Sequence, residues 1–118
     1  MQTIIDIAQN WDGSAEQKKK FHRDCKKWLK CVADEMKLDP KDYDIRSNPG
    51  GPAVLGDVIL HTDSLYVNLG GSYYSSQFMY RSCKGRKDYT GGRNNWMLYE
   101  DMCNLQKVVY RFQNPLGW

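Results

Sequence analysis

The chain has 118 residues, a formal net charge of +3 and 26% charged residues. A chain of this length is expected to form about one domain, residues 1–118. It contains no run of ~18 apolar residues that would span a bilayer, and its first residues lack the basic and then apolar pattern of a secretory signal. We therefore expect a cytoplasmic protein with no membrane contact.

Residues 3–10 could form a short helix or a short strand, because Ile4, Ile5 and Ile7 fit neither period well over so short a run. The next segment has a clear helical signal, because Ser14 and Gln17 have the spacing of a capping box and apolar residues then recur every three or four positions. This pattern predicts an amphipathic helix over about 14–37, which ends before Pro40 because proline disfavours helical geometry in the residue before it.

The predicted helix has a basic face opposite its apolar stripe. Its cations are Lys18, Lys19, Lys20, Arg23, Lys26, Lys27 and Lys30. Such a face is common on the solvated side of an ordinary amphipathic helix. The functional alternative is a footprint for phosphates or for an acidic protein.

After Pro40 the period of the apolar residues changes from 3.6 to 2, which is typical of strands. Four strands are predicted, at residues 43–46, 57–62, 64–69 and 77–83. Short turns join the last three, so consecutive hairpins should give an antiparallel sheet. A short helix over about 96–106 and a final strand at 108–112 follow. The predicted fold class is α+β: a long N-terminal amphipathic helix packed on a small antiparallel sheet, with a short C-terminal helix.

The cysteines and histidines predict no metal site and no cofactor. Neither His22 nor His61 has zinc-ligand spacing to a cysteine, and no two cysteines form a CxxC pair. We expect four free thiols, at Cys25, Cys31, Cys83 and Cys103. Among them Cys83 is the candidate for a reactive thiol, because neighbouring Arg81 and Lys84 would lower its pKa.

An enzymatic reading depends on Asp57, His61 and Asp63, which would belong to a small metal-dependent hydrolase or nuclease. Asp57 and His61 share one face of a predicted strand, but four residues of extended chain separate them by roughly 13 Å. That separation excludes a hydrogen bond between Asp57 and His61. His61 and Asp63 could lie on one face across the turn, but two ligands make an incomplete metal site. The sequence therefore favours a binding protein without catalytic residues over an enzyme.

Residues 78–96 are the strongest candidate for a binding site. This stretch contains five basic residues, four aromatic residues and three glycines. Glycines let the backbone approach a partner closely, and Lys and Arg suit phosphates. The structural alternative is a charged turn that is polar for solubility only. We predict that the binding residues are Arg81, Lys84, Arg86, Lys87, Tyr89, Arg93, Asn94, Asn95 and Trp96.

Different roles are expected within this set. Lys84, Lys87 and Arg93 would contact phosphates. The aromatic rings, including that of Tyr80, would stack on bases. The two asparagines are suited to reading base edges. The expected partner is nucleic acid or a ribonucleoprotein, with an acidic protein surface as the alternative.

Charge is distributed unevenly along the chain. Residues 14–30 carry a local charge of +5, residues 81–93 carry +4, and the remainder therefore carries −6. A chain polarised in this way can present a basic surface although its net charge is small. The sequence leaves open whether the two basic segments lie on one surface, and it does not indicate the oligomeric state.

The run YRSCKGRKDYTGGRNNW, residues 80–96, resembles a motif in short uncharacterised proteins of bacteriophages and mobile elements. The resemblance implies a host-interaction protein or an inhibitor of host defence, of which anti-CRISPR proteins are one type, acting in the host cytoplasm. Many such inhibitors are acidic DNA mimics, and the net charge of +3 argues against mimicry. The alternative is an inhibitor that binds a protein of the host complex without contacting nucleic acid.

Overall fold

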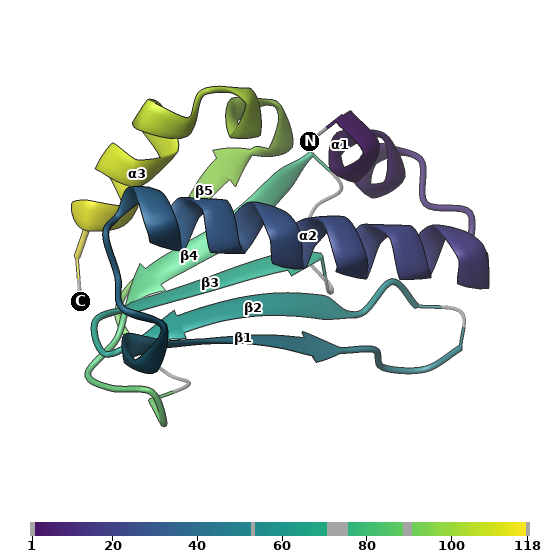
Figure 1. Ribbon diagram of the computed structural model, residues 1–118. Coiled ribbons are helices and arrows are strands. Elements are labelled where there is room, and N and C mark those ends of the chain that lie inside the picture. The colour runs from purple at the N-terminus through teal and green to yellow at the C-terminus, as the bar shows by residue number, and fades with distance from the viewer. Residues whose placement is uncertain (1, 53, 71–75, 89–90, 118) are drawn as a thin grey trace.

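Five antiparallel strands form one sheet in which the order in space follows the order in the chain, β1-β2-β3-β4-β5. The computed structural model describes residues 2–52, 54–70, 76–88 and 91–117. Figure 1 shows the helices gathered on one face of the sheet, with α2 running across it. The strands are β1 (Tyr43–Asn48), β2 (Asp57–Thr62), β3 (Leu65–Gly70), β4 (Gln77–Ser82) and β5 (Asn95–Leu98).

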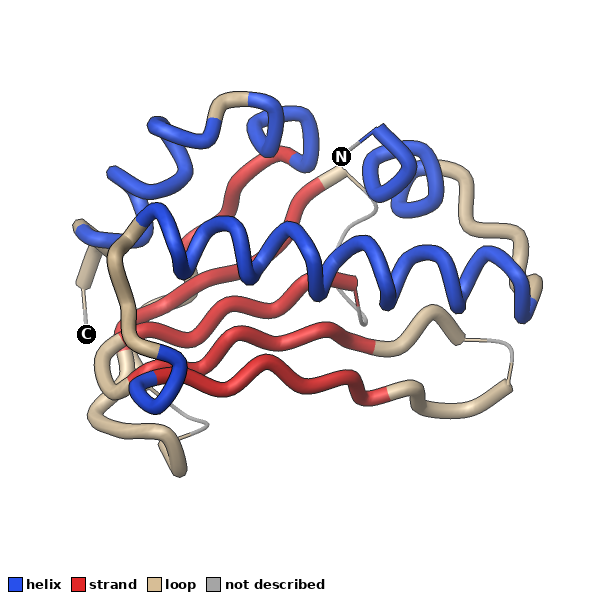
Figure 2. Tube along the Cα trace, in the orientation of Figure 1, coloured by secondary structure: helices blue, strands red, loops and turns tan. Residues whose placement is uncertain are grey.

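The helices account for most of the remaining described chain. They are α1 (Gln2–Gln9), α2 (Ala15–Glu35), the 3-10 helices η1 (Pro40–Asp42) and η2 (Tyr99–Cys103), and α3 (Leu105–Gln113). Figure 2 shows the loops that join these elements at the two ends of the sheet. The predicted α+β class is confirmed, as are the long N-terminal helix, the antiparallel sheet and the short C-terminal helix. Of the described residues, no helix is long and apolar enough to cross a membrane.

The long helix α2 forms where the sequence signals it. Ser14 lies at its N-cap, where its hydroxyl accepts a hydrogen bond from the backbone N–H of Gln17 at 3.1 Å, which satisfies one of the free donors of the first turn. The helix ends where Lys37 adopts a left-handed conformation with φ of 60°. Its apolar stripe is buried on the sheet, so burial of this stripe, rather than helix propensity, holds α2 in place.

Alternation along the strands creates two differently packed faces. Residues such as Val67 and Tyr80 point toward the helices and join the main core. A smaller cluster on the back face, defined as the face away from the helices, contains Ile59, Tyr66, Met79 and Cys83, with Trp96 packed against it. For the four strands predicted between residues 43 and 83, the predicted bounds agree with the structure to within two residues.

The main core is held by aromatic side chains from three elements. Trp28 of α2 meets Phe78 of β4 edge-to-face at 5.9 Å between ring centroids. It also meets Phe112 of α3 at 6.5 Å in the same geometry. Edge-to-face pairs place a positive ring edge on a negative ring face, so they fix orientation as well as burying area. This three-way contact brings the N-terminal and C-terminal helices onto one core.

The predictions for the C-terminal region are wrong in two places. Residues 96–106, predicted as a helix, begin in β5 and continue as η2. Residues 108–112, predicted as a strand, belong to α3. The Asn104 side chain caps α3 by accepting from the Lys107 backbone N–H at 3.1 Å. The β-branched residues of this short run resemble a strand locally, but burial of Val108, Val109 and Phe112 on one side favours the helix.

Candidate nucleic-acid interface

The loop after β4 is held by its own hydrogen bonds. The two carboxylate oxygens of Asp88 accept from the backbone N–H groups of Lys84 and Gly91, each at 2.9 Å. The backbone N–H of Gly92 donates to the Ser82 carbonyl at 2.7 Å, which closes the loop at its base. Gly91 has φ of 38°, and a Cβ there would lie 2.4 Å from the Ser82 oxygen. The glycine is therefore required by the close approach of two backbone segments.

Arg86 fastens this loop to the edge of the sheet. Its Nε lies 3.3 Å from a carboxylate oxygen of Asp63, and its terminal nitrogens lie 2.5 Å from the Lys41 carbonyl and 3.8 Å from Asp44. These contacts engage each of the three guanidinium nitrogens inside the molecule. The geometry of Arg86 is that of a structural link, and its membership of a binding site stays a prediction.

Arg81 and Asn94 are also engaged internally. The Arg81 guanidinium lies over the Tyr66 ring, 4.5 Å from its centroid, and donates to the Asn94 side-chain oxygen at 3.4 Å. A cation stacked on an aromatic face in this way is held in one orientation. Arg81 therefore covers part of the back face, while Asn94 remains exposed beside it.

Asn95 is not placed to read a base edge. The residue is buried, and its amide nitrogen donates to the carbonyls of Arg93 and Leu116 at 2.9 and 3.0 Å. Its amide oxygen accepts from the Leu116 backbone N–H at 3.1 Å. The side chain thus fastens the C-terminal tail to β5, and its predicted contact with a partner stays a prediction that these internal bonds do not support.

The aromatic residues of the predicted site are divided between the two faces. Tyr80 is fully buried on the helix side, where its hydroxyl accepts from Arg111 at 2.8 Å, so it cannot stack on a base. Trp96 is half-buried against the back-face cluster. Tyr89 lies outside the described residues. Of the predicted cations, Lys84, Lys87 and Arg93 are exposed.

A larger set of exposed cations lies on α2. These side chains, called here the α2 basic face, are Lys19, Lys20, Arg23, Lys26, Lys27 and Lys30. With 3.6 residues per turn they fall within roughly 120° of the helix circumference and span about 16 Å of its axis. Lys18 is half-buried and donates to the Gly51 carbonyl at 2.9 Å instead.

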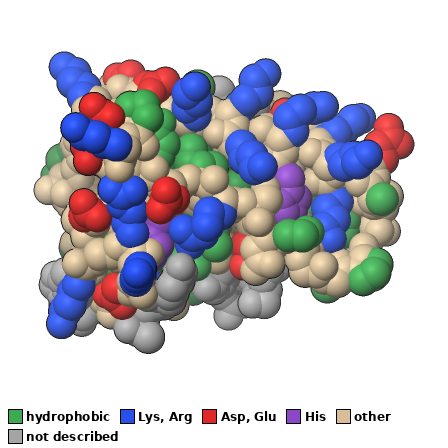
Figure 3. Space-filling model, turned by 60° about the horizontal axis from the view of Figure 1, so that its bottom comes forward, with side chains coloured by type: hydrophobic (Ala, Val, Ile, Leu, Met, Phe, Trp, Pro, Cys, Tyr) green, Lys and Arg blue, Asp and Glu red, His purple; other side chains and the backbone are tan. Residues whose placement is uncertain are grey.

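The α2 basic face carries little compensating charge. Arg23 contacts Asp24 at 3.0 Å, and Lys20 contacts Glu16 at the limiting distance of 4.0 Å. Figure 3, turned so that the bottom of Figure 1 comes forward, shows Lys and Arg side chains following the line of α2, whereas at the left end they alternate with Asp and Glu. The predominantly cationic surface therefore belongs to α2.

The two basic segments lie on opposite faces of the sheet. The backbone at Gly85 lies beside His61, whose ring meets Tyr66 of the back face edge-on, and Gly91 packs against Arg81 of the same face. The α2 helix covers the other face. As far as the described residues 81–88 and 91–93 go, the sheet therefore separates the two basic segments, and they do not form a single patch.

The catalytic alternatives find no support in this geometry. Asp63 contacts Arg86, and Asp57 lies 3.5 Å from the Asn68 amide, so neither converges on His61. Burial raises the pKa of Cys83, the opposite of the expected activation, although a backbone contact at Gly85 partly offsets it. The described residues contain no group of three or more His, Cys, Asp or Glu side chains that could hold a metal ion.

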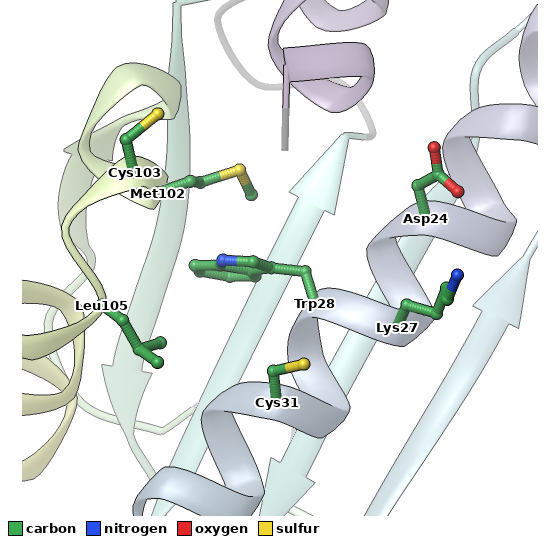
Figure 4. A pocket seen from close by; sticks show the side chains of 7 residues that line it. All are labelled: Asp24, Lys27, Trp28, Cys31, Met102, Cys103 and Leu105. Carbon is green, nitrogen blue, oxygen red and sulfur yellow. The ribbon is translucent and has the colours of Figure 1, made fainter.

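A cavity of about 440 Å³ opens between α2 and the η2–α3 segment. Figure 4 shows Trp28 reaching from α2 toward Met102 and Leu105, with the cysteine side chains on either side of it. Its lining residues are Asp24, Lys27, Trp28, Cys31, Met102, Cys103 and Leu105. Both cysteines are exposed free thiols, and Lys27 at the rim also belongs to the α2 basic face.

Comparison of the chain with family models, with curated proteins and with solved structures finds no match. The resemblance of residues 80–96 to phage and mobile-element proteins, and the inhibitor role that it implies, therefore stay predictions.

Proposed function

We propose that the protein binds nucleic acid, alone or within a ribonucleoprotein, by contacting the phosphate backbone with the α2 basic face. The observation that carries this proposal is the set of six exposed cations on one side of a single well-anchored helix. Lys87 and Arg93, exposed in the segment between β4 and β5, provide a second, smaller cationic contact. The proposal keeps the expected class of partner but moves the main contact from the loop to the helix.

Like charges on the α2 basic face repel one another in the unbound protein. Lys19 precedes Arg23 by four residues, and Lys26 precedes Lys30 by the same spacing. Such pairs each destabilise a helix by roughly 0.2–0.5 kcal/mol. A polyanion would relieve this repulsion and release its own condensed counterions, which favours binding.

The chemistry of the face favours backbone contact over base reading. Lys dominates it, and an ammonium group acts as a compact point charge without the planar donor fork of Arg. Such contacts position a protein on phosphates but carry no sequence information. We therefore expect affinity to depend on salt much more than on nucleotide sequence.

The first test is charge removal followed by salt titration. Replacing Lys19, Arg23, Lys26 and Lys30 by Ala should reduce the slope of log affinity against log salt by roughly one for each phosphate that the variant no longer neutralises. Fluorescence anisotropy with labelled single-stranded and double-stranded oligonucleotides of unrelated sequence measures both slope and affinity. The matched control is the loop variant K87A/R93A, which should weaken binding less.

The outcome of this test separates three cases. Equal binding by the four-residue variant and the wild type would refute the role of α2. Greater loss of affinity in K87A/R93A would return the site to the loop. If oligonucleotides fail to bind while a pull-down from nuclease-treated lysate recovers a partner through α2, the anionic partner is an acidic protein.

A further inference from the structure

The edge strand β1 is open on one side. Within the part of the chain that the structure describes, the order β1-β2-β3-β4-β5 leaves β1 paired with β2 alone. Its six residues keep an unbroken register and include no proline and no bulge. An edge of this kind presents backbone N–H and C=O groups that can pair with another strand.

The alternation of backbone hydrogen bonds identifies the groups that point outward. The Cys83 N–H donates to the Ser64 carbonyl at 3.0 Å, and hydrogen-bonded pairs recur at every second position of an antiparallel ladder. In the observed registers, the even-numbered residues of β3 bond to β4, so the odd-numbered residues of β3 bond to β2. Their partners are the even-numbered residues of β2, which leaves the odd-numbered residues of β2 to bond to β1. The bonds from β1 to β2 are therefore made by the even-numbered residues of β1. The outward groups of β1 are therefore those of Tyr43, Ile45 and Ser47.

In one antiparallel register of β1 against β1 of a second copy, the outward backbone groups can pair and opposite charges face each other. Centred on Ile45, it places Ile45 opposite Ile45 of the second copy and Tyr43 opposite Ser47, which matches outward groups with outward groups. Asp44 then lies opposite Arg46 twice, in the positions where cross-strand side chains approach most closely. A shift of one step in either direction would place Asp44 opposite Asp44, or Arg46 opposite Arg46.

The opposite edge of the sheet is closed by its own chain. The Leu98 backbone N–H of β5 donates to the Asp101 side chain at 3.3 Å. The C-terminal tail lies beside the same strand, held by the bonds between Asn95 and Leu116. Of the two edge strands, β1 is therefore the one that offers a regular pairing surface.

We propose that the protein forms a two-fold symmetric dimer in which β1 pairs with β1 of a second copy. The two five-stranded sheets then become one continuous antiparallel sheet. Asp44 retains its contact with Arg86, because half of its side chain is exposed and its carboxylate has capacity for a second partner. Since the two-fold axis is perpendicular to the sheet, both α2 helices lie on the same side. The interface is small, so association is weak and concentration-dependent.

Charge reversal with complementary variants tests this register. D44R and R46D should each weaken self-association by roughly tenfold or more, because two attractive pairs become repulsive. An equimolar mixture of the two variants should associate at least as well as the wild type, since every cross-strand pair between them is again of opposite charge. Sedimentation velocity over a wide concentration range measures each case. Any effect of Arg46 on its own chain persists in the mixture, so recovery there reports pairing between copies.

A backbone variant and a charge control complete the experiment. I45P removes an outward N–H but no bond to β2, so the fold should survive, as checked by circular dichroism, while dimerisation is lost. K26D makes the same charge change as R46D on the surface of α2 and should leave the dimer intact. A wild type that stays monomeric at the highest concentration overturns the proposal. So does a mixture that associates no better than its components, or a dimer that is insensitive to I45P.

Discussion

Tyr99 joins two parts of the chain through one buried hydroxyl group. Its oxygen accepts from the backbone N–H of Gly70 at 2.7 Å, inside the main core. Gly70 has φ of 89°, and a Cβ there would lie 2.6 Å from the Gly56 carbonyl. Burial raises the pKa of Tyr99 well above its usual value, which keeps the hydroxyl neutral. The end of β3 thus depends on a side chain from η2.

Replacing Tyr99 by Phe should destabilise the protein by about 1–3 kcal/mol. The change leaves the buried Gly70 N–H without its acceptor, and an unsatisfied buried donor loses its hydration without compensation. Urea denaturation followed by circular dichroism measures the loss. Tyr110→Phe is the matched control, because that ring is 67% exposed. Equal stability of the two variants would contradict the structural role of the hydroxyl.

At the level of elements, the loop between β4 and β5 and the helix α2 use their charges differently. Arg81 near the end of β4 and Arg86 in the loop hold the chain together, and Asp88 caps two backbone donors. On α2 the exposed cations have few acidic neighbours. The two segments have similar local charges in the sequence, +5 and +4, but the structure leaves more of the α2 cations available to a partner.

Asp88→Ala should loosen the loop and lower stability by roughly 1–2 kcal/mol. Two backbone N–H groups lose a charged acceptor, and hydrogen bonds to charged groups are stronger than neutral ones. Hydrogen exchange measured by mass spectrometry should show faster exchange in peptides covering 83–94. Asp88→Asn keeps an oxygen for one of the donors, so it should fall between the wild type and the alanine variant. Unchanged exchange in the alanine variant would show that the glycines alone define the loop.

At the scale of the whole molecule, the pKa of His61 depends on groups from both the sheet and the loop after β4. It is fully buried on the back face, edge-on to Tyr66 at 5.2 Å between ring centroids. Burial lowers its pKa, and the charge of Arg46 lowers it further. The Gly85 backbone and the carboxylates of Asp44 and Asp88 act in the opposite direction. The folded protein therefore holds this imidazole in its neutral form more strongly than the unfolded chain does.

The lowered pKa of His61 predicts a loss of stability in mild acid. Its contribution is fully present above the unfolded value of about 6.5 and decreases as pH falls below it, because the unfolded chain then binds the proton more readily. Urea denaturation at a series of pH values between about 7.5 and 5 measures the slope. His61→Gln cannot titrate and should flatten the slope in this range. A slope identical to that of the wild type would show that another group titrates on unfolding.

Dimerisation through β1 would also increase the number of cations that the α2 basic face offers to a nucleic acid. Two copies of that face on one side of a continuous sheet would double the number of cations that can reach the phosphates of a single nucleic acid. Binding would then be bivalent and tighter than the contribution of one helix. D44R, which is designed to weaken the dimer without altering α2, can separate this effect from the chemistry of the helix.

The sequence by itself determined the parts of the fold that depend on local signals. The Ser14 cap and the helical period defined α2, and alternation of the kind seen in Leu65, Val67 and Leu69 defined the strands and their two faces. These signals are reliable because burying one face requires a particular period. The α+β class could be predicted for the same reason.

Only the tertiary structure decided which polar side chains of residues 81–96 are available to a partner. Arg86 and Asn95 carry the same functional groups whether they bind nucleic acid or the protein itself, and their internal partners come from residues far away in the sequence. The C-terminal helix depended on the same kind of information, because its short run of residues allowed either structure until Phe112 packed against Trp28 and Phe78. Contacts between residues far apart in the sequence leave no local pattern. The exposed cations of α2, in contrast, could be predicted from the helical period of its apolar residues.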